Sequence, residues 1–183
     1  MRTRNALLVL CSLALASAGA IAKNSVDRAQ TFELEKQFSQ RAMALWGDDR
    51  YMFFLLPRAY TVDHFGIVLT SEMNLAPGPA PGLAAFGGPI TKQAIAAHKR
   101  TVLERMTKFR QFLKSELLDA AGMFPGEPDT DRVSIAVTIY HFSWEDSSDI
   151  PTQIVVQGIK KNLLEAKAKP ALADQAIEMK DTE

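Results

Sequence analysis

The chain has 183 residues, with 21 basic and 21 acidic side chains and a single cysteine, Cys11. This balance of charge argues against general nucleic-acid binding, which depends on an excess of positive charge. The length fits one domain of ordinary size.

The first 22 residues are typical of a secretory signal peptide. Two arginines form a positive head, residues 6–15 are an almost unbroken apolar run, and a final Ala-Ile-Ala places small side chains where a signal peptidase reads before cutting. We therefore predict a signal peptide over 1–22, cleavage after Ala22, and export to the periplasm or the cell exterior. Cleavage after Ala18 and an uncleaved anchor are the alternatives, although the run falls short of the ~20 strongly apolar residues that span a bilayer.

Cleavage would also change what chemistry the chain can perform. It removes Cys11 and two of the 21 basic residues, which leaves 19 basic against 21 acidic side chains, or −2. A mature chain without cysteine excludes disulfides, cysteine nucleophiles and cysteine-ligated zinc or iron–sulfur sites. A lipoprotein is disfavoured because Leu10, before the cysteine, is not small. We predict no transmembrane helix in the mature chain, since no comparable apolar run follows.

Helical periodicity predicts three helices. The first runs from a cap at Asn24 or Ser25 to Trp46, the longest spans 91–123 behind a threonine cap, and the third spans 160–169 before a proline. Apolar residues at helical spacing mark the core faces of the first two helices: Leu34, Phe38, Ala42, Leu45 and Trp46, then Ile95, Val102, Met106, Phe109, Leu113 and Leu117.

Four strands are predicted between the helices. They cover 51–56, which Pro57 stops, then 65–75, 133–142 and 153–157. Alternating apolar residues place one face of the second and third strands on the core. The first two strands are expected to form a hairpin, although the first run is short enough to be a buried helical turn instead.

This order of elements favours a two-layer α+β fold. We predict a mainly antiparallel sheet of about four strands, packed with two long helices and a shorter C-terminal helix. One globular domain would cover 23–169, followed by a polar C-terminal tail, 170–183, that frays. The segment 76–89 holds four prolines and four glycines, which neither a helix nor a strand tolerates. It is either a lid or binding segment or a disordered connection.

Histidine-based chemistry has few candidates, since the chain holds three histidines. His64 follows Asp63 at the entry to the second strand, and Glu72 lies on the less apolar face of that strand. His141 lies near the end of the third strand. If these strands pair, His64, Glu72 and His141 would converge and suit a catalytic zinc, and the alternative is three unrelated histidines.

A serine nucleophile is not supported by the sequence, because Ser71 lacks the Gly-x-Ser-x-Gly turn that exposes a nucleophile. We assign no catalytic residue, metal or cofactor.

An acidic loop follows the third strand. Glu145, Asp146 and Asp149, together with two serines, offer the hard oxygen ligands that calcium prefers, but not the spacing of a helix–loop–helix calcium site. The alternative is a hydrated hairpin loop, with Trp144 folded onto the sheet.

Basic side chains follow one flank of the longest predicted helix. Lys92, Lys99, Arg100, Arg110 and Lys114 lie within a wedge of about 100°. They could recognise an anionic partner, a lipid headgroup or an acidic polysaccharide. The alternative is a solvated flank whose long side chains cover the edge of the core.

Two functions remain open at the level of sequence. The first is a non-enzymatic binding module of the cell envelope, with a protein or envelope partner that contacts the sheet edge, the acidic loop, the basic flank or the segment 76–89. The second is a small metal-dependent or hydrolytic enzyme that uses Asp63, His64, Glu72 and His141. The absence of any nucleophile–base or metal signature favours the first.

Overall fold

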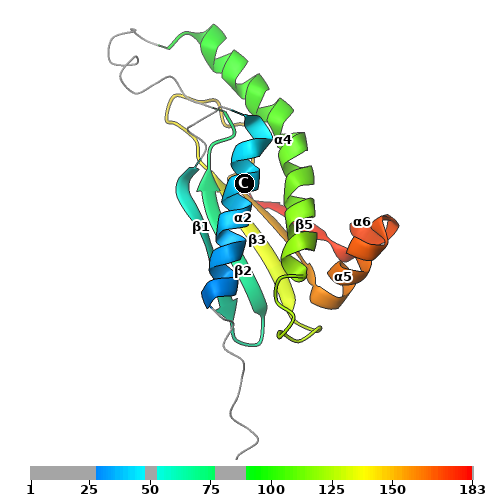
Figure 1. Cartoon of the computed structure of the whole chain (residues 1–183). Helices are drawn as coiled ribbons and strands as arrows, with labels where there is room; N and C mark the ends of the chain where they lie inside the picture. Colours follow the sequence, from blue (N-terminus) through cyan, green and yellow to red (C-terminus); the bar gives the residue numbers. More distant parts are fainter. Residues whose placement is uncertain (1–27, 48–52, 77–89, 183) are drawn as a thin grey trace, which may run out of the picture.

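The structure, a computed structural model, describes residues 28–47, 53–76 and 90–182 (Figure 1). The predicted signal peptide and residues 77–89 of the proline- and glycine-rich segment lie outside this part of the chain. In chain order the elements are α2 (Arg28–Trp46), β1 (Phe53–Val62), β2 (Gly66–Met73), α4 (Lys92–Ala121), β3 (Arg132–Ile139), β4 (Gln153–Ile159), α5 (Lys160–Ala168), η1 (Pro170–Leu172), α6 (Ala173–Ala176) and β5 (Glu178–Thr182).

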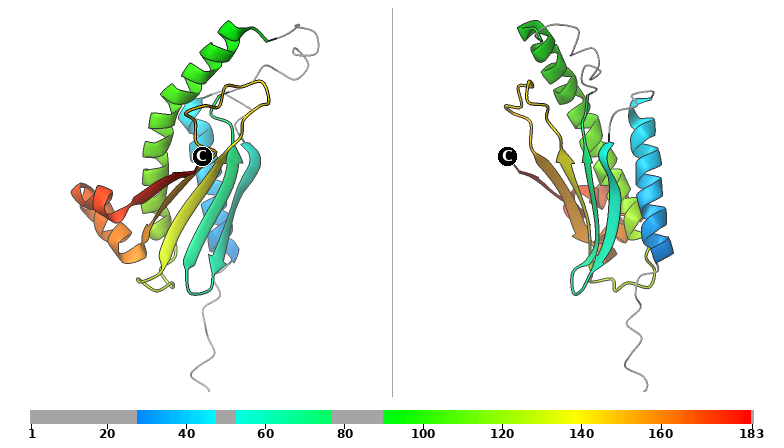
Figure 2. Two further views of the ribbon diagram at one scale, coloured as in Figure 1. Left: turned by 180° about the vertical axis from the view of Figure 1, so that it is seen from behind. Right: turned by 90° about the vertical axis from the view of Figure 1, so that its left-hand side faces the viewer.

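Five strands form one sheet in the order β1-β2-β3-β4-β5. Neighbouring strands are antiparallel except β2 and β3, which run parallel because the crossover through α4 returns the chain to the same end of the sheet. Helices α2 and α4 lie on one face of the sheet (Figure 2). The predicted two-layer α+β fold with a mainly antiparallel sheet is confirmed, with one strand more than expected. No helix in the described ranges is both long and apolar enough to cross a bilayer.

The core lies between the sheet and the two long helices. The predicted apolar face of α4 is buried from Val102 to Leu117, and so are the predicted inward positions of β3 from Val133 to Ile139. Ile95 is only half-buried, because the first turns of α4 extend past the end of the sheet (Figure 1). Helix α4 begins as predicted, since the Thr91 hydroxyl accepts a hydrogen bond from the Ala94 N–H at 3.2 Å.

The first strand is longer than predicted. β1 passes through Pro57, where we expected it to stop. Its register with β2 shifts between Leu55 and Arg58, so the proline lies at a bulge. Proline is tolerated there because β1 is an edge strand, and one side of an edge strand makes no ladder hydrogen bonds.

The prediction that residues 170–183 form a fraying polar tail is wrong in part. Residues 170–182 form η1, α6 and a fifth strand, which pairs with β4. This strand has a weak hydrophobic pattern: Ile177, just before it, is buried, and Met179 is partly buried, whereas the other residues of β5 are exposed. The domain in the described chain therefore includes this segment.

A close backbone approach joins the starts of β2 and β3. Gly66 has φ +122°, a conformation that residues with a side chain rarely adopt, and it pairs with Arg132. A Cβ atom at this position would collide with the carbonyl oxygen of Arg132. The Arg132 N–H also donates to the carbonyl oxygen of Phe65 at 2.7 Å. Only glycine fits where the two parallel strands first meet.

Candidate functional site

The residues predicted for catalysis are dispersed. Asp63 and His64 lie in the exposed turn between β1 and β2, and His64 has φ +61°. Glu72 lies near the other end of β2, about 25 Å away at the usual rise per residue of a strand. His141 follows β3 and faces Glu145. The structure therefore does not bring His64, Glu72 and His141 into one site.

A different cluster forms where α4 crosses the loop after β3. The Glu145 carboxylate lies between two imidazoles: its Oε1 is 2.8 Å from Nε2 of His98, and its Oε2 is 3.4 Å from Nδ1 of His141. The side chain of Glu145 is 3% exposed, and those of His98 and His141 are 10% and 16% exposed. The amide of Asn74 also donates to this carboxylate at 3.4 Å.

The ring nitrogens of this cluster are incompletely satisfied. The short contact of His98 Nε2 with Glu145 is poorly aligned for a hydrogen bond, and Nε2 of His141 is buried without a hydrogen-bond partner among the described residues. Each ring faces a different carboxylate oxygen. In keeping with this, no three His, Cys, Asp or Glu side chains in the described ranges are grouped so that they could hold a metal ion.

Lys99 of α4 pairs with two carboxylates of the acidic loop. Its ammonium lies 3.0 Å from Asp146 and 3.2 Å from Asp149, and it donates to the Ser148 hydroxyl at 2.5 Å. Hydrogen bonds from Ser148, followed by the Lys99 ammonium, lower the pKa of Asp146 to about 2. This single ammonium lies within ion-pair distance of both carboxylates. Trp144 packs edge-on against His98, with ring centroids 4.9 Å apart.

The predicted basic flank is largely paired with the chain itself. Arg110 holds Asp181 of β5 through two hydrogen bonds of 3.1 and 2.5 Å, and Lys114 lies 2.7 Å from Asp174 of α6. These pairs attach the C-terminal segment to α4. Together with Lys99, they account for three of the five basic side chains, and Lys92 and Arg100 are exposed at the end of α4 that extends past the sheet.

The sheet face opposite the helices is open in the described chain, and on its β4–β5 half polar and charged side chains pair with one another beside the exposed Ile159. The Gln157 amide donates to Glu178 at 2.7 Å, and the Lys180 ammonium lies 2.8 Å from the same carboxylate. Lys180, followed by Gln157, lowers the pKa of Glu178. This half of the open face therefore pairs its own charges.

The β1–β2 half of the open face is different, because apolar side chains are exposed there. Leu55, Leu56, Tyr60 and Val62, which we call the β1 surface, are 61, 62, 53 and 44% exposed. They are four of the eight large apolar side chains that are exposed in the described chain. Tyr60 and Val62 face away from the helices, since they alternate along the strand with the buried Ala59.

The β1 surface borders a groove of about 520 Å³. Thr70, Ser71 and Thr138 contribute short polar side chains to its lining, and the Ser71 hydroxyl donates to the Leu55 carbonyl at the bulge at 3.2 Å. The groove therefore combines an apolar rim with hydroxyl groups. Its lining consists of Leu55, Leu56, Arg58, Tyr60, Thr70, Ser71, Glu72 and Thr138.

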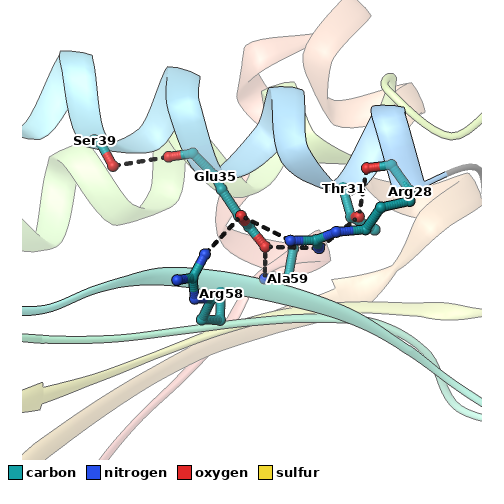
Figure 3. A network of polar contacts seen from close by, with 6 residues as sticks. All are labelled: Arg28, Thr31, Glu35, Ser39, Arg58 and Ala59. Carbon is teal, nitrogen blue, oxygen red and sulfur yellow. Dashed lines mark hydrogen bonds and ion pairs between the residues drawn. The ribbon is translucent and has the colours of Figure 1, made fainter.

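A buried carboxylate of α2 holds β1 in place (Figure 3). Glu35 is 5% exposed, and its Oε1 accepts a hydrogen bond from the backbone N–H of Ala59 at 3.0 Å. Arg28 donates to the same oxygen at 3.0 Å, and Arg58 donates to Oε2 at 3.4 Å. Glu35 thus joins α2 to the edge strand through one backbone donor and two guanidinium groups.

The electrostatics of Glu35 favour its charged form. Burial alone would raise the pKa of this carboxyl, but the Ala59 N–H and the guanidinium groups of Arg28 and Arg58 outweigh burial and hold the pKa below its ordinary value of 4.5.

Sequence reasoning missed three features of these sites. Glu35 lies in a charged stretch of its helix and outside the predicted apolar face, and His98 is a lone histidine in a long helix. The β1 surface extends past Pro57, which the strand prediction excluded. Comparison with known proteins adds no assignment, because no family model, curated protein or solved structure matches the chain.

Proposed function

We propose that the chain is an exported, non-enzymatic binding module of the cell envelope and that the β1 surface is its contact area. One observation carries the proposal: half of the exposed large apolar side chains in the described ranges lie on one strand, beside a groove. A contiguous exposed apolar patch on a folded protein is typical of an interaction site. The signal-peptide pattern over 1–22 supports the envelope location.

The partner that fits this surface is a polypeptide that presents apolar side chains. Leu55 and Leu56 offer an apolar rim, and Tyr60 combines a large ring with a hydroxyl group, a residue type enriched at interfaces. An anionic polymer fits less well, because Arg110 and Lys114 already pair with acidic side chains of the same chain.

Side-chain packing on the open face is the expected mode of contact, in preference to addition of a strand. An added strand needs free backbone donors along the edge. On β1 the Ala59 N–H is engaged by Glu35, and Pro57 has no N–H to offer. At the other edge of the sheet, β5 is short and charged. Both edges thus carry features that discourage strand pairing.

The geometry favours the binding module over the alternative of a metal-dependent or hydrolytic enzyme. The alternative required His64, Glu72 and His141 in one cavity, and the first two lie at opposite ends of β2. The cluster around Glu145 has a different composition and a different position.

Disruption of the β1 surface is the direct test of this function. A photoactivatable cross-linker at position 55 is expected to capture a partner polypeptide in intact envelopes, and Leu56→Glu is expected to lower the yield at least about tenfold, because a buried carboxylate is poorly compensated in an apolar contact. Cross-linked species are quantified by immunoblot and identified by mass spectrometry.

The matched control is Leu103→Glu, which makes the same substitution at an exposed leucine of α4. It is expected to leave the cross-linking yield unchanged. Equal losses in the two variants, or no loss at Leu56, would contradict the assignment of the β1 surface.

Export is checked separately by N-terminal sequencing of the protein recovered from cells. The expected first residue is Lys23, in the envelope or medium fraction. Recovery of the whole chain from the cytosolic fraction, still beginning at Met1, would contradict export.

A further inference from the structure

We propose that His98, Glu145 and His141 form a proton-operated latch, which fastens the loop between β3 and β4 to α4 when an imidazole is protonated and loosens when both rings are neutral. The latch is independent of the β1 surface, which lies on another part of the sheet.

The geometry provides one carboxylate for two rings. His98 belongs to α4, whereas Glu145 and His141 belong to the loop, so the contact of Glu145 with His98 connects two separate segments. The contact distances are 2.8 Å to His98 and 3.4 Å to His141, and the carboxylate is almost entirely removed from solvent. Charge interactions are screened least in such surroundings.

Protonation changes the strength of these contacts more than their geometry. Nε2 of the His98 ring lies 2.8 Å from Oε1 of Glu145 but makes no hydrogen bond with it, because the two groups are poorly aligned. Coulomb attraction does not need this alignment, and a protonated ring 2.8 Å from a carboxylate forms an ion pair in any orientation. With neutral rings, the best-placed donor to the buried carboxylate is the Asn74 amide, at 3.4 Å. A second proton, on the other ring, adds less, because the two cations repel each other.

Two neighbouring charged groups, Lys99 and Asp146, keep a constant charge over the range in which imidazoles ordinarily titrate. Lys99 of α4 pairs with Asp146 and Asp149 of the loop, its pKa is raised by these partners, and the pKa of Asp146 is about 2. At the end of β2 the group that faces Glu145 is the uncharged amide of Asn74, which also donates to the Tyr140 carbonyl. These contacts attach the loop in both states of the latch, and protonation of an imidazole adds a further attraction.

Trp144 reports directly on the state of the latch. Its ring packs against His98 at 4.9 Å and stacks on Phe142 at 5.6 Å, between α4 and the loop. Separation of the loop from α4 would expose this ring to solvent. The chain has one other tryptophan, Trp46, which a Trp46→Phe background removes from the signal.

The experiment measures acrylamide quenching of Trp144 in Trp46→Phe protein at pH 5.5 and pH 8. The Stern–Volmer constant is expected to be at least about twofold larger at pH 8. In the variant His98→Gln, His141→Gln it is expected to be the same at both pH values. The matched control His64→Gln changes the exposed histidine at the hairpin turn and is expected to keep the full pH response. Far-UV circular dichroism verifies that each protein is folded.

Two results would overturn the latch: a quenching constant in the parent protein that does not change with pH, or a pH response that persists in the double histidine variant. If that variant does not fold, Glu145→Gln decides, because it keeps the shape of the side chain and removes its charge. Loss of the pH response in Glu145→Gln supports the latch, and an unchanged response contradicts it.

Discussion

Replacing Gly66 by alanine is expected to destabilise the protein by at least about 3 kcal/mol. The new Cβ atom would collide with the carbonyl oxygen of Arg132, and φ +122° is unfavourable for any residue with a side chain. Relief of the collision requires the start of β2 to move away from β3, which breaks the parallel pairing. Thermal unfolding followed by circular dichroism is expected to show a fall in Tm of at least about 6 °C.

Gly47→Ala separates the two causes of this loss. Gly47 also has a positive φ, +73°, but a Cβ atom there would meet no described atom within 4 Å. The expected cost is therefore only the backbone penalty of about 1 kcal/mol. Equal destabilisation by the two substitutions would show that the close approach to Arg132 contributes nothing.

Removal of the Glu35 carboxylate is expected to have the second-largest effect. Glu35→Ala leaves the N–H of Ala59 without its acceptor and Arg28 and Arg58 without their common partner. We expect a loss of about 2 kcal/mol, most of it from the buried backbone donor, because both arginine side chains are more than half exposed and exposed ion pairs contribute little. Urea unfolding measures the loss as a change in the free energy of unfolding.

The matched control for this loss is Glu33→Ala, on an exposed side of the same helix, where Glu33 contacts Lys36 and Gln37. Its expected effect is below about 0.5 kcal/mol. A loss at Glu33 as large as that at Glu35 would show that helix propensity, and not the attachment to β1, accounts for both.

Glu35 also makes stability depend on pH in a defined direction. Its pKa in the folded protein lies below the ordinary value of 4.5, so its stabilising contribution is present above that value and is lost as the pH falls through the folded pKa. Glu35→Gln removes this part of the pH dependence. We expect the difference in the free energy of unfolding between parent and Glu35→Gln to be constant above about pH 5.5 and to shrink in acid. If this difference in the free energy of unfolding grew on acidification, it would contradict a lowered pKa for Glu35.

The sequence predicted those elements whose hydrophobic pattern is strong. α4 has a threonine cap, a long apolar stripe and a glycine at its end, and these local signals are sufficient for its bounds. β3 alternates strictly over Val133–Ile139 and was predicted for the same reason. β5 was missed because its stability comes from pairing with β4 and from ion pairs such as Arg110–Asp181, neither of which leaves a pattern along the chain.

The candidate sites were harder to predict because they depend on tertiary contacts. Glu145 was considered either as a calcium ligand or as part of a hydrated loop, but the structure buries it between rings from two segments more than 40 residues apart in sequence, His98 and His141. Asp146 and Asp149 were considered as calcium ligands, and only the position of Lys99 on α4 shows that a cation of the chain already lies there. Sequence shows which side chains are charged, but not which charges the fold pairs.

The parallel pairing of β2 with β3 has a consequence for how the chain reaches this fold. The hairpin of β1 with β2 closes through a three-residue turn, whereas β2 can meet β3 only after the whole crossover, α4 included, has been brought into place. Contacts that close such long loops form late in folding, because the chain loses the entropy of loop closure before these contacts stabilise it. We therefore expect refolding to be limited by the joining of two preformed halves along this pair of strands, and substitutions there to slow refolding more than those in either half.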